Sequence, residues 1–169
     1  MNSLRLGLVV FLAVVVQIAA INRISLFGIR PDLTVLVVVS VALRRGSLTG
    51  TLVGFLVGLL QDLLVPSTLG MNMLAKSILG FAAGRLGQNL AVPGLPLYGP
   101  LLALAVIFHD WIYLLAYTSL DPGRFLRLFV MRSLPTALYT AVAGVILLLL
   151  AAWLGGARLI PRQESGGGR

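Results

Sequence analysis

Long apolar runs separated by short polar stretches make up most of the chain. None of the runs alternates with a period of two, which disfavours barrel strands, and helices are the other structure that satisfies the backbone within lipid. We therefore predict an all-α, polytopic membrane protein, with each run judged against the roughly 20 apolar residues that cross a bilayer. About six transmembrane helices are expected, namely Leu6–Ile21, Pro31–Leu43, Ser47–Val65, Gly70–Gly84, Tyr98–Tyr117 and a last span from Phe125 or Leu134 to Leu154.

The second predicted span is short. Its residues, Pro31 to Leu43, would rise only about 20 Å as a helix, against a hydrocarbon core of about 30 Å. Pro31 stands where a helix favours its first residue, and Asp32 in the first turn would face the positive end of the helix dipole. We expect this span to tilt little, to be shielded by neighbouring helices, or to be extended by the apolar patch between Arg23 and Arg30.

Glycines recur every four residues through the third predicted span. Gly46, Gly50, Gly54 and Gly58 are followed at the next step by Asp62, and this spacing places all five on one ridge of a helix. Small residues let helix backbones approach closely in a membrane, so the ridge predicts a packing strip. The strip could hold helices of one chain together or receive a partner helix, and the sequence leaves both open.

The fourth predicted span repeats this arrangement. Asn72, Lys76, Gly80 and Gly84 also fall at four-residue steps. Two adjacent helices are thus expected each to carry a smooth strip and an ionisable group.

Four charged residues fall within the predicted spans or near their ends, with a histidine beside one of them. The charged residues are Asp62, Lys76, Asp110 and Arg132, and the histidine is His109. A charge within the hydrocarbon costs at least ~2.5 kcal/mol, so such groups usually pair or face the bundle interior. Asp62 and Lys76 lie near the same end of one predicted helical hairpin, and Asp110 and Arg132 near the same end of the next. We therefore predict ion pairs between Asp62 and Lys76 and between Asp110 and Arg132. A proton or ion pathway and a docking surface for partner helices remain alternatives.

Composition sets the class of protein. The 169 residues are 59% hydrophobic and 11% charged, with a mean hydropathy of +1.02, which a water-soluble domain of this size could not bury in one core. We predict a single transmembrane helical domain, residues 1–155, and a short polar cytoplasmic tail, residues 156–169, that is disordered. The net charge of +8 does not indicate nucleic-acid binding, because the basic residues are scattered singly or in pairs.

Arginines in the short loops predict the orientation of the chain in the membrane. With a cytoplasmic N-terminus, seven arginines would lie inside and four outside, which favours both termini in the cytoplasm. The inside set is Arg5, Arg44, Arg45, Arg85, Arg158, Arg162 and Arg169, and the outside set is Arg23, Arg30, Arg124 and Arg127.

Catalytic and metal sites are not indicated. The chain has no cysteine and one histidine, too few ligands for a metal cluster. His109 and Asp110 are neighbours on a predicted helix, where side chains point about 100° apart, so we expect no hydrolase dyad from their adjacency. No serine nucleophile elbow accompanies them. We therefore predict no enzyme activity, no cofactor and no metal.

Three segments in order carry a family resemblance. They are FGIRPDLTVLVVV at residues 27–39, GTLVGFLVGLLQDLL at residues 50–64 and LGMNMLAKSILGFAAGRLG at residues 69–87. Their order and spacing, with the size and span count of the chain, resemble the MreD family of rod-shape-determining membrane proteins. From Leu90 onward the likeness lies in hydropathy alone. The residues that stand where the family pattern has them are Pro31, Asp32, Leu33, Gly58, Leu59, Leu60, Asp62, Gly70 and Asn72.

The resemblance implies a non-enzymatic subunit of the bacterial elongation machinery in the inner membrane. Such a subunit would bind the bitopic protein MreC and work with MreB, RodA and a class B penicillin-binding transpeptidase, surrounded by membrane lipid. Pro31 and Asp32 join the two glycine strips as candidate packing or partner-contact residues. The family is also similar in architecture to the six-helix substrate-binding subunits of energy-coupling-factor transporters. This likeness implies an alternative function, the binding of a vitamin-like small molecule, which would need a polar pocket toward the outer face.

Overall fold

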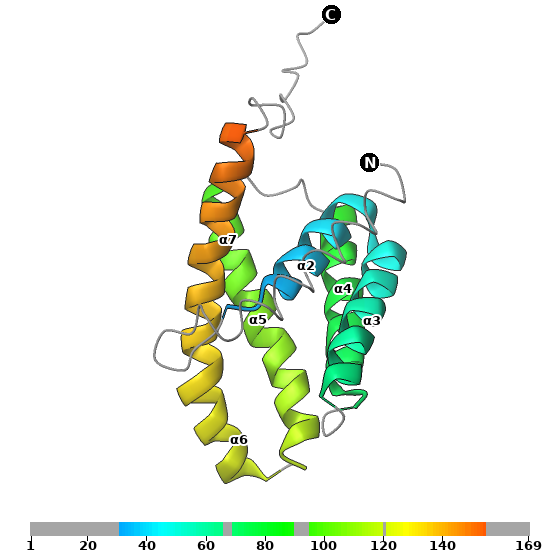
Figure 1. Ribbon diagram of the computed structural model, residues 1–169, viewed down its shortest axis with the longest axis vertical. Helices are drawn as coiled ribbons and strands as arrows, with labels where there is room; N and C mark the ends of the chain where they lie inside the picture. Colours follow the sequence, from blue (N-terminus) through cyan, green and yellow to red (C-terminus); the bar gives the residue numbers. More distant parts are fainter. Residues whose placement is uncertain (1–30, 66–68, 90–94, 120, 155–169) are drawn as a thin grey trace, which may run out of the picture.

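The computed structural model describes residues 31–65, 69–89, 95–119 and 121–154, and in these residues it is helical with no strand. The first predicted span and the C-terminal tail lie outside the described residues. The elements, drawn in Figure 1, are α2 (Leu33–Arg45), α3 (Ser47–Leu64), α4 (Met71–Asn89), α5 (Leu95–Tyr117), α6 (Pro122–Leu128), the π-helical η2 (Phe129–Ser133) and α7 (Leu134–Leu154).

The helices follow the apolar runs closely. The third predicted span is confirmed by α3, whereas α4 continues past Gly84 to Asn89. The last span begins at Pro122, because α6, η2 and α7 follow one another without a break. In the described part of the chain, three helices are long and apolar enough to cross a membrane: Ser47–Leu64, Leu97–Tyr117 and Pro122–Leu147. The count of six spans stays a prediction.

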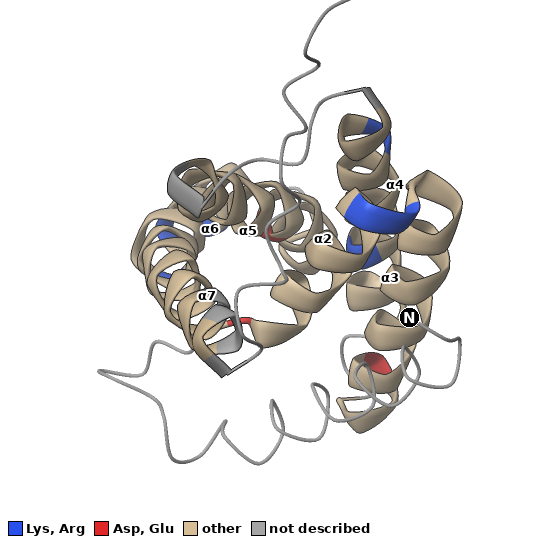
Figure 2. Ribbon diagram, turned by 90° about the horizontal axis from the view of Figure 1, so that it is seen from above, with Lys and Arg blue, Asp and Glu red and all other residues tan. Residues whose placement is uncertain are grey.

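The short helix α2 is the central element of the bundle. It lies between a pair formed by α3 and α4 and a second pair formed by α5 and α7, as the view from above shows (Figure 2), and it contacts all four helices. Val35, Val38 and Ala42 of α2 are fully buried. Shielding by neighbouring helices is therefore confirmed as the reason why a helix of 13 residues can lie within the bundle.

Two apolar clusters pack against α2. The larger joins α2 to α4, α5 and α7 and includes Val35, Val39, Ala42, Leu79, Leu102, Val106 and Ala137. The smaller joins α2 to α3 through Val38, Val41, Val53 and Val57. Most large apolar side chains on the outer faces of α3, α4, α5 and α7 are exposed, as expected of helices that face lipid.

The two ends of α2 are fixed by specific residues. Asp32 is the N-cap residue, one step before the helix and not in its first turn, and its side chain accepts hydrogen bonds from the amides of Thr34 (2.9 Å) and Val35 (3.1 Å). At the other end Gly46 has φ +85°, a left-handed conformation that favours glycine. Gly46 is therefore the turn between α2 and α3, one step before the α3 helix, and it still packs against α4, since a β-carbon on Gly84 would lie 2.6 Å from the Gly46 carbonyl carbon.

Candidate functional site

The glycine strips of α3 and α4 pack against each other inside the chain. Gly50, Gly54 and Gly58 are buried, and each faces the backbone of α4. A β-carbon on Gly54 would lie 2.6 Å from the Lys76 carbonyl carbon, and one on Gly58 would lie 2.5 Å from the Met73 nitrogen. Backbone atoms in a packed helix cannot move aside as a flexible side chain can, so these positions admit only glycine.

The contact is reciprocal. A β-carbon on Gly80 of α4 would lie 2.5 Å from the Gly50 carbonyl carbon, and one on Gly84 would lie 2.5 Å from the Ser47 nitrogen. The two strips predicted from four-residue spacing thus form one interface between adjacent helices. The structure places them within the fold and not on its outer surface.

Asp62, at the end of the α3 strip, binds the start of α4. Its Oδ2 accepts hydrogen bonds from the amides of Gly70 and Met73, both at 2.9 Å. Its Oδ1 accepts from the amide of Asn72 at 3.2 Å and from the Asn72 side chain at 2.9 Å. A carboxylate at this place satisfies amides that a helix leaves without partners in its first turn, and it interacts favourably with the helix dipole. Asp62 therefore closes the α3–α4 hairpin.

Lys76 takes a different partner from the one that the sequence predicted. Its Nζ lies 3.0 Å from Asp32 Oδ2 and 3.0 Å from His109 Nε2. The predicted pair between Asp62 and Lys76 is wrong, because backbone amides occupy Asp62 while Lys76 reaches across the bundle to α2 and α5. The Lys76 side chain is fully buried, whereas that of Asp32 is 20% exposed.

The ring of His109 continues the network toward Asp110. His109 Nδ1 lies 3.0 Å from Asp110 Oδ1, so the two side chains contact each other although neighbouring positions on a helix point about 100° apart. A lysine ammonium group only donates, and His109 Nε2 must therefore accept. The hydrogen then resides on Nδ1 and is donated to Asp110. This assignment makes His109 neutral, with both ring nitrogens hydrogen-bonded.

Arg132 lies apart from this network. It is exposed, and in the described residues Asp32 pairs with Lys76 while Asp110 accepts from the neutral ring of His109. The predicted pair between Asp110 and Arg132 is therefore wrong. Asp110 instead bonds the ring nitrogen of the preceding residue through Oδ1.

Three further polar residues complete the network and were not predicted. The Asp32 amide donates to Thr140 Oγ1 on α7 at 2.9 Å, and the Thr34 hydroxyl donates to Asp32 Oδ1. Gln61 of α3 donates from Nε2 to Thr34 Oγ1 at 3.2 Å. The signal that could have found them is a single polar side chain within an apolar run, which within lipid needs a partner.

The network links five helices by hydrogen bonds among their own side chains and caps. The network joins α2, α3, α4, α5 and α7. Outside the network, a hydrogen bond between the hydroxyl groups of Ser40 and Tyr98 joins α2 to α5 nearer the other end of α2. Buried charged and polar groups that bond one another fix the register of the helices that carry them. No group of three or more residues that could hold a metal ion occurs in the described ranges.

Comparisons with known proteins identify a family. The family model for rod shape-determining protein MreD matches residues 2–154 of the 169-residue chain. Comparisons with curated proteins and with solved structures gave no match.

Proposed function

Because the chain belongs to the MreD family of rod shape-determining proteins, we propose that it is a non-enzymatic scaffold subunit of the bacterial elongation machinery. In this proposal it binds MreC in the inner membrane and helps to control lateral peptidoglycan synthesis. MreB, RodA and a class B penicillin-binding transpeptidase complete the assembly.

The polar network is the observation that carries the proposal, because its charged groups all bond one another or the start of a helix. In the described residues, Gln61 Oε1 and Ser133 Oγ are the buried side-chain atoms without a hydrogen-bond partner, and both are uncharged. Asp32, Lys76, His109 and Asp110 bond one another, and Asp62 is occupied by the start of α4. These groups bond other groups of the same chain and so hold its helices in position relative to one another. A scaffold needs a rigid bundle of this kind with an apolar exterior for partner helices, whereas a vitamin-binding subunit needs polar groups that are left for a ligand.

Partner helices would then meet the outer faces of the bundle. The glycine strips are buried between α3 and α4, so they support the internal packing of the hairpin. The outward side chains are large and apolar, and within α3 and α4 they are Leu52, Phe55, Leu56, Leu74, Ile78 and Phe81. Van der Waals packing against such faces drives helix association in lipid.

The proposed orientation has both termini in the cytoplasm. It rests on the excess of arginines in the predicted inside loops. Reporter fusions at Gly156 and Thr68 should report opposite compartments. A periplasmic reporter at Gly156 would show that this orientation is wrong.

Affinity purification of the full chain from native membranes in mild detergent tests the proposal. Proteins and small molecules that co-purify are identified together. MreC and other wall-synthesis proteins should be recovered, and a tightly bound vitamin-like molecule in their place would overturn the scaffold function. Photo-crosslinking residues at Phe55, Phe81, Leu104 and Leu138, which are exposed and lie on different helices, then show which face contacts MreC.

A further inference from the structure

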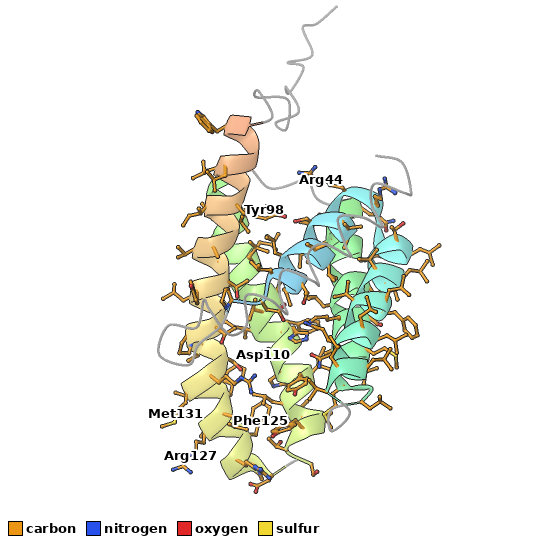
Figure 3. The ribbon with its side chains drawn as sticks, viewed as in Figure 1. Arg44, Tyr98, Asp110, Phe125, Arg127 and Met131 are labelled. Carbon is orange, nitrogen blue, oxygen red and sulfur yellow. The ribbon has the colours of Figure 1, made fainter. Side chains whose placement is uncertain are left out.

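Three arginines lie within nine residues at one end of the molecule. Arg124 and Arg127 of α6 and Arg132 of η2 are all exposed. Figure 3 shows Arg127 and Met131 at the end of the bundle opposite to Arg44. We call the exposed residues of α6 and η2 the basic end.

The arginines of the basic end have no carboxylate partner in the described part of the chain. The basic side chains that contact carboxylates there are Lys76 and His109. The nearest acidic residue in sequence, Asp121, uses its Oδ1 to cap α6, accepting from the amides of Gly123 (3.0 Å) and Arg124 (3.2 Å). The three guanidinium groups are therefore available to an external anion.

Large apolar side chains alternate with these arginines. Leu126 is 62% exposed and Met131 is 70% exposed, with Val130 between them in sequence at 50%. The rings of Phe125 and Phe129, one helical turn apart, stack with centroids 5.6 Å apart and add further apolar surface to the segment. A ligand that covers the exposed face must therefore offer both an anion and apolar groups.

The length of the helix places this segment near the boundary of the hydrocarbon. The 7, 5 and 21 residues of α6, η2 and α7 together span about 50 Å, against a hydrocarbon core of about 30 Å. Part of this continuous helix must extend beyond the core. Its N-terminal segment carries the arginines, which favour the headgroup region.

We propose that the basic end binds the headgroup of an anionic phospholipid. The planar guanidinium groups of Arg124, Arg127 and Arg132 hydrogen-bond the phosphate oxygens, a geometry that arginine matches better than lysine. The acyl chains lie along Leu126 and Met131. A lipid supplies the anion and the apolar groups in one molecule, which a free phosphate does not.

Lipid titration of the purified full chain in detergent tests the proposal. Phosphatidylglycerol and phosphatidylcholine with identical acyl chains are compared, and retained lipid is counted by native mass spectrometry. Phosphatidylglycerol should bind more tightly, and each change of Arg124, Arg127 or Arg132 to Gln should weaken its binding about fivefold. Binding of phosphatidylcholine should be unchanged by these substitutions.

The control removes the same type of charge from the opposite end. Arg44→Gln with Arg85→Gln should leave phosphatidylglycerol binding as in the unmodified chain. Equal affinity of the unmodified chain for the two lipids would overturn the proposal, and this comparison needs no variant. An equal loss in the control would overturn it as well. Glycerol phosphate binding as tightly as phosphatidylglycerol, or displacement of the lipid by an acidic peptide, would each identify a different ligand class and contradict the lipid site.

Discussion

Lys76 and Asp32 lie 44 positions apart in the sequence, and Lys76 Nζ lies 3.0 Å from Asp32 Oδ2. This contact joins the second turn of α4 to the N-cap of α2. Because His109 Nε2 is equally close to Lys76 Nζ, α5 is held at the same point. The central short helix is thereby fixed to both helix pairs of the bundle.

Removing one member of the Asp32–Lys76 pair should be strongly destabilising and asymmetric. Breaking a buried pair costs about 3 to 5 kcal/mol when a charge is left without its partner. Asp32→Asn leaves the fully buried Lys76, whereas Lys76→Met leaves a carboxylate that is 20% exposed and still bonded to amides. We expect Asp32→Asn to lower the free energy of unfolding more than Lys76→Met, as measured by denaturant titration in detergent.

The double variant gives the control for this prediction. Asp32→Asn with Lys76→Met should lose less free energy of unfolding than the sum of the losses in the two single variants, because no charge remains unpaired. Asp62→Asn with Lys76→Met should show a smaller coupling energy, since Asp62 bonds the start of α4 instead. A larger coupling of Lys76 to Asp62 than to Asp32 would contradict the network.

Asp62→Ala should loosen the start of α4 specifically. The variant removes every acceptor used by the amides of Gly70, Asn72 and Met73. Loss of a helix cap costs about 0.5 to 2 kcal/mol, and a carboxylate with several donors should lie at the upper end of that range. Hydrogen exchange followed by mass spectrometry should show faster exchange at residues 70–73. Unchanged protection of these amides would argue against the cap.

The protonation of His109 is a direct consequence of its two neighbours. Lys76 donates to Nε2, so the ring should be neutral with its hydrogen on Nδ1, bonded to Asp110. The chain has one histidine, so imidazole ¹⁵N signals can be assigned without mutation. The Nδ1 resonance should be that of a protonated nitrogen and the Nε2 resonance that of an unprotonated one. The opposite pattern would exclude a hydrogen bond from Lys76.

The sequence was sufficient for α3 and for the packing strips. Apolar run length and four-residue spacing are properties of one helix, so they predict α3 and the ridges of Gly54 and Gly80 without knowledge of the tertiary structure. Turn chemistry was harder to predict. Gly46 continues the spacing of the strip and yet forms the turn before α3.

The partners of the charges could not be predicted in the same way. Asp62 and Lys76 belong to adjacent helices, but the amides at the start of α4 compete for Asp62, and these donors are not visible as side chains in the sequence. The partner of Lys76 depends on where α2 crosses the bundle. Thr140 joined the network for the same reason, since its contact with Asp32 depends on how α7 lies beside α2.

The central claim is that the glycine strips hold the fold while partners meet its outer faces, and Gly54→Ala tests it most directly. The added methyl group would meet the backbone of Lys76, and such overpacking costs about 1 to 3 kcal/mol. Gly99→Ala is the matched control, because its β-carbon would meet only a methyl group of the Val145 side chain, at 3.2 Å.

The measurement is membrane abundance together with the amount of MreC that co-purifies per folded molecule. For Gly54→Ala we expect abundance to fall while MreC per folded molecule stays as in the unmodified chain, and Gly99→Ala should change neither. A Gly54→Ala protein that remains folded and abundant but no longer co-purifies MreC would contradict the account, because the strip would then be the partner interface.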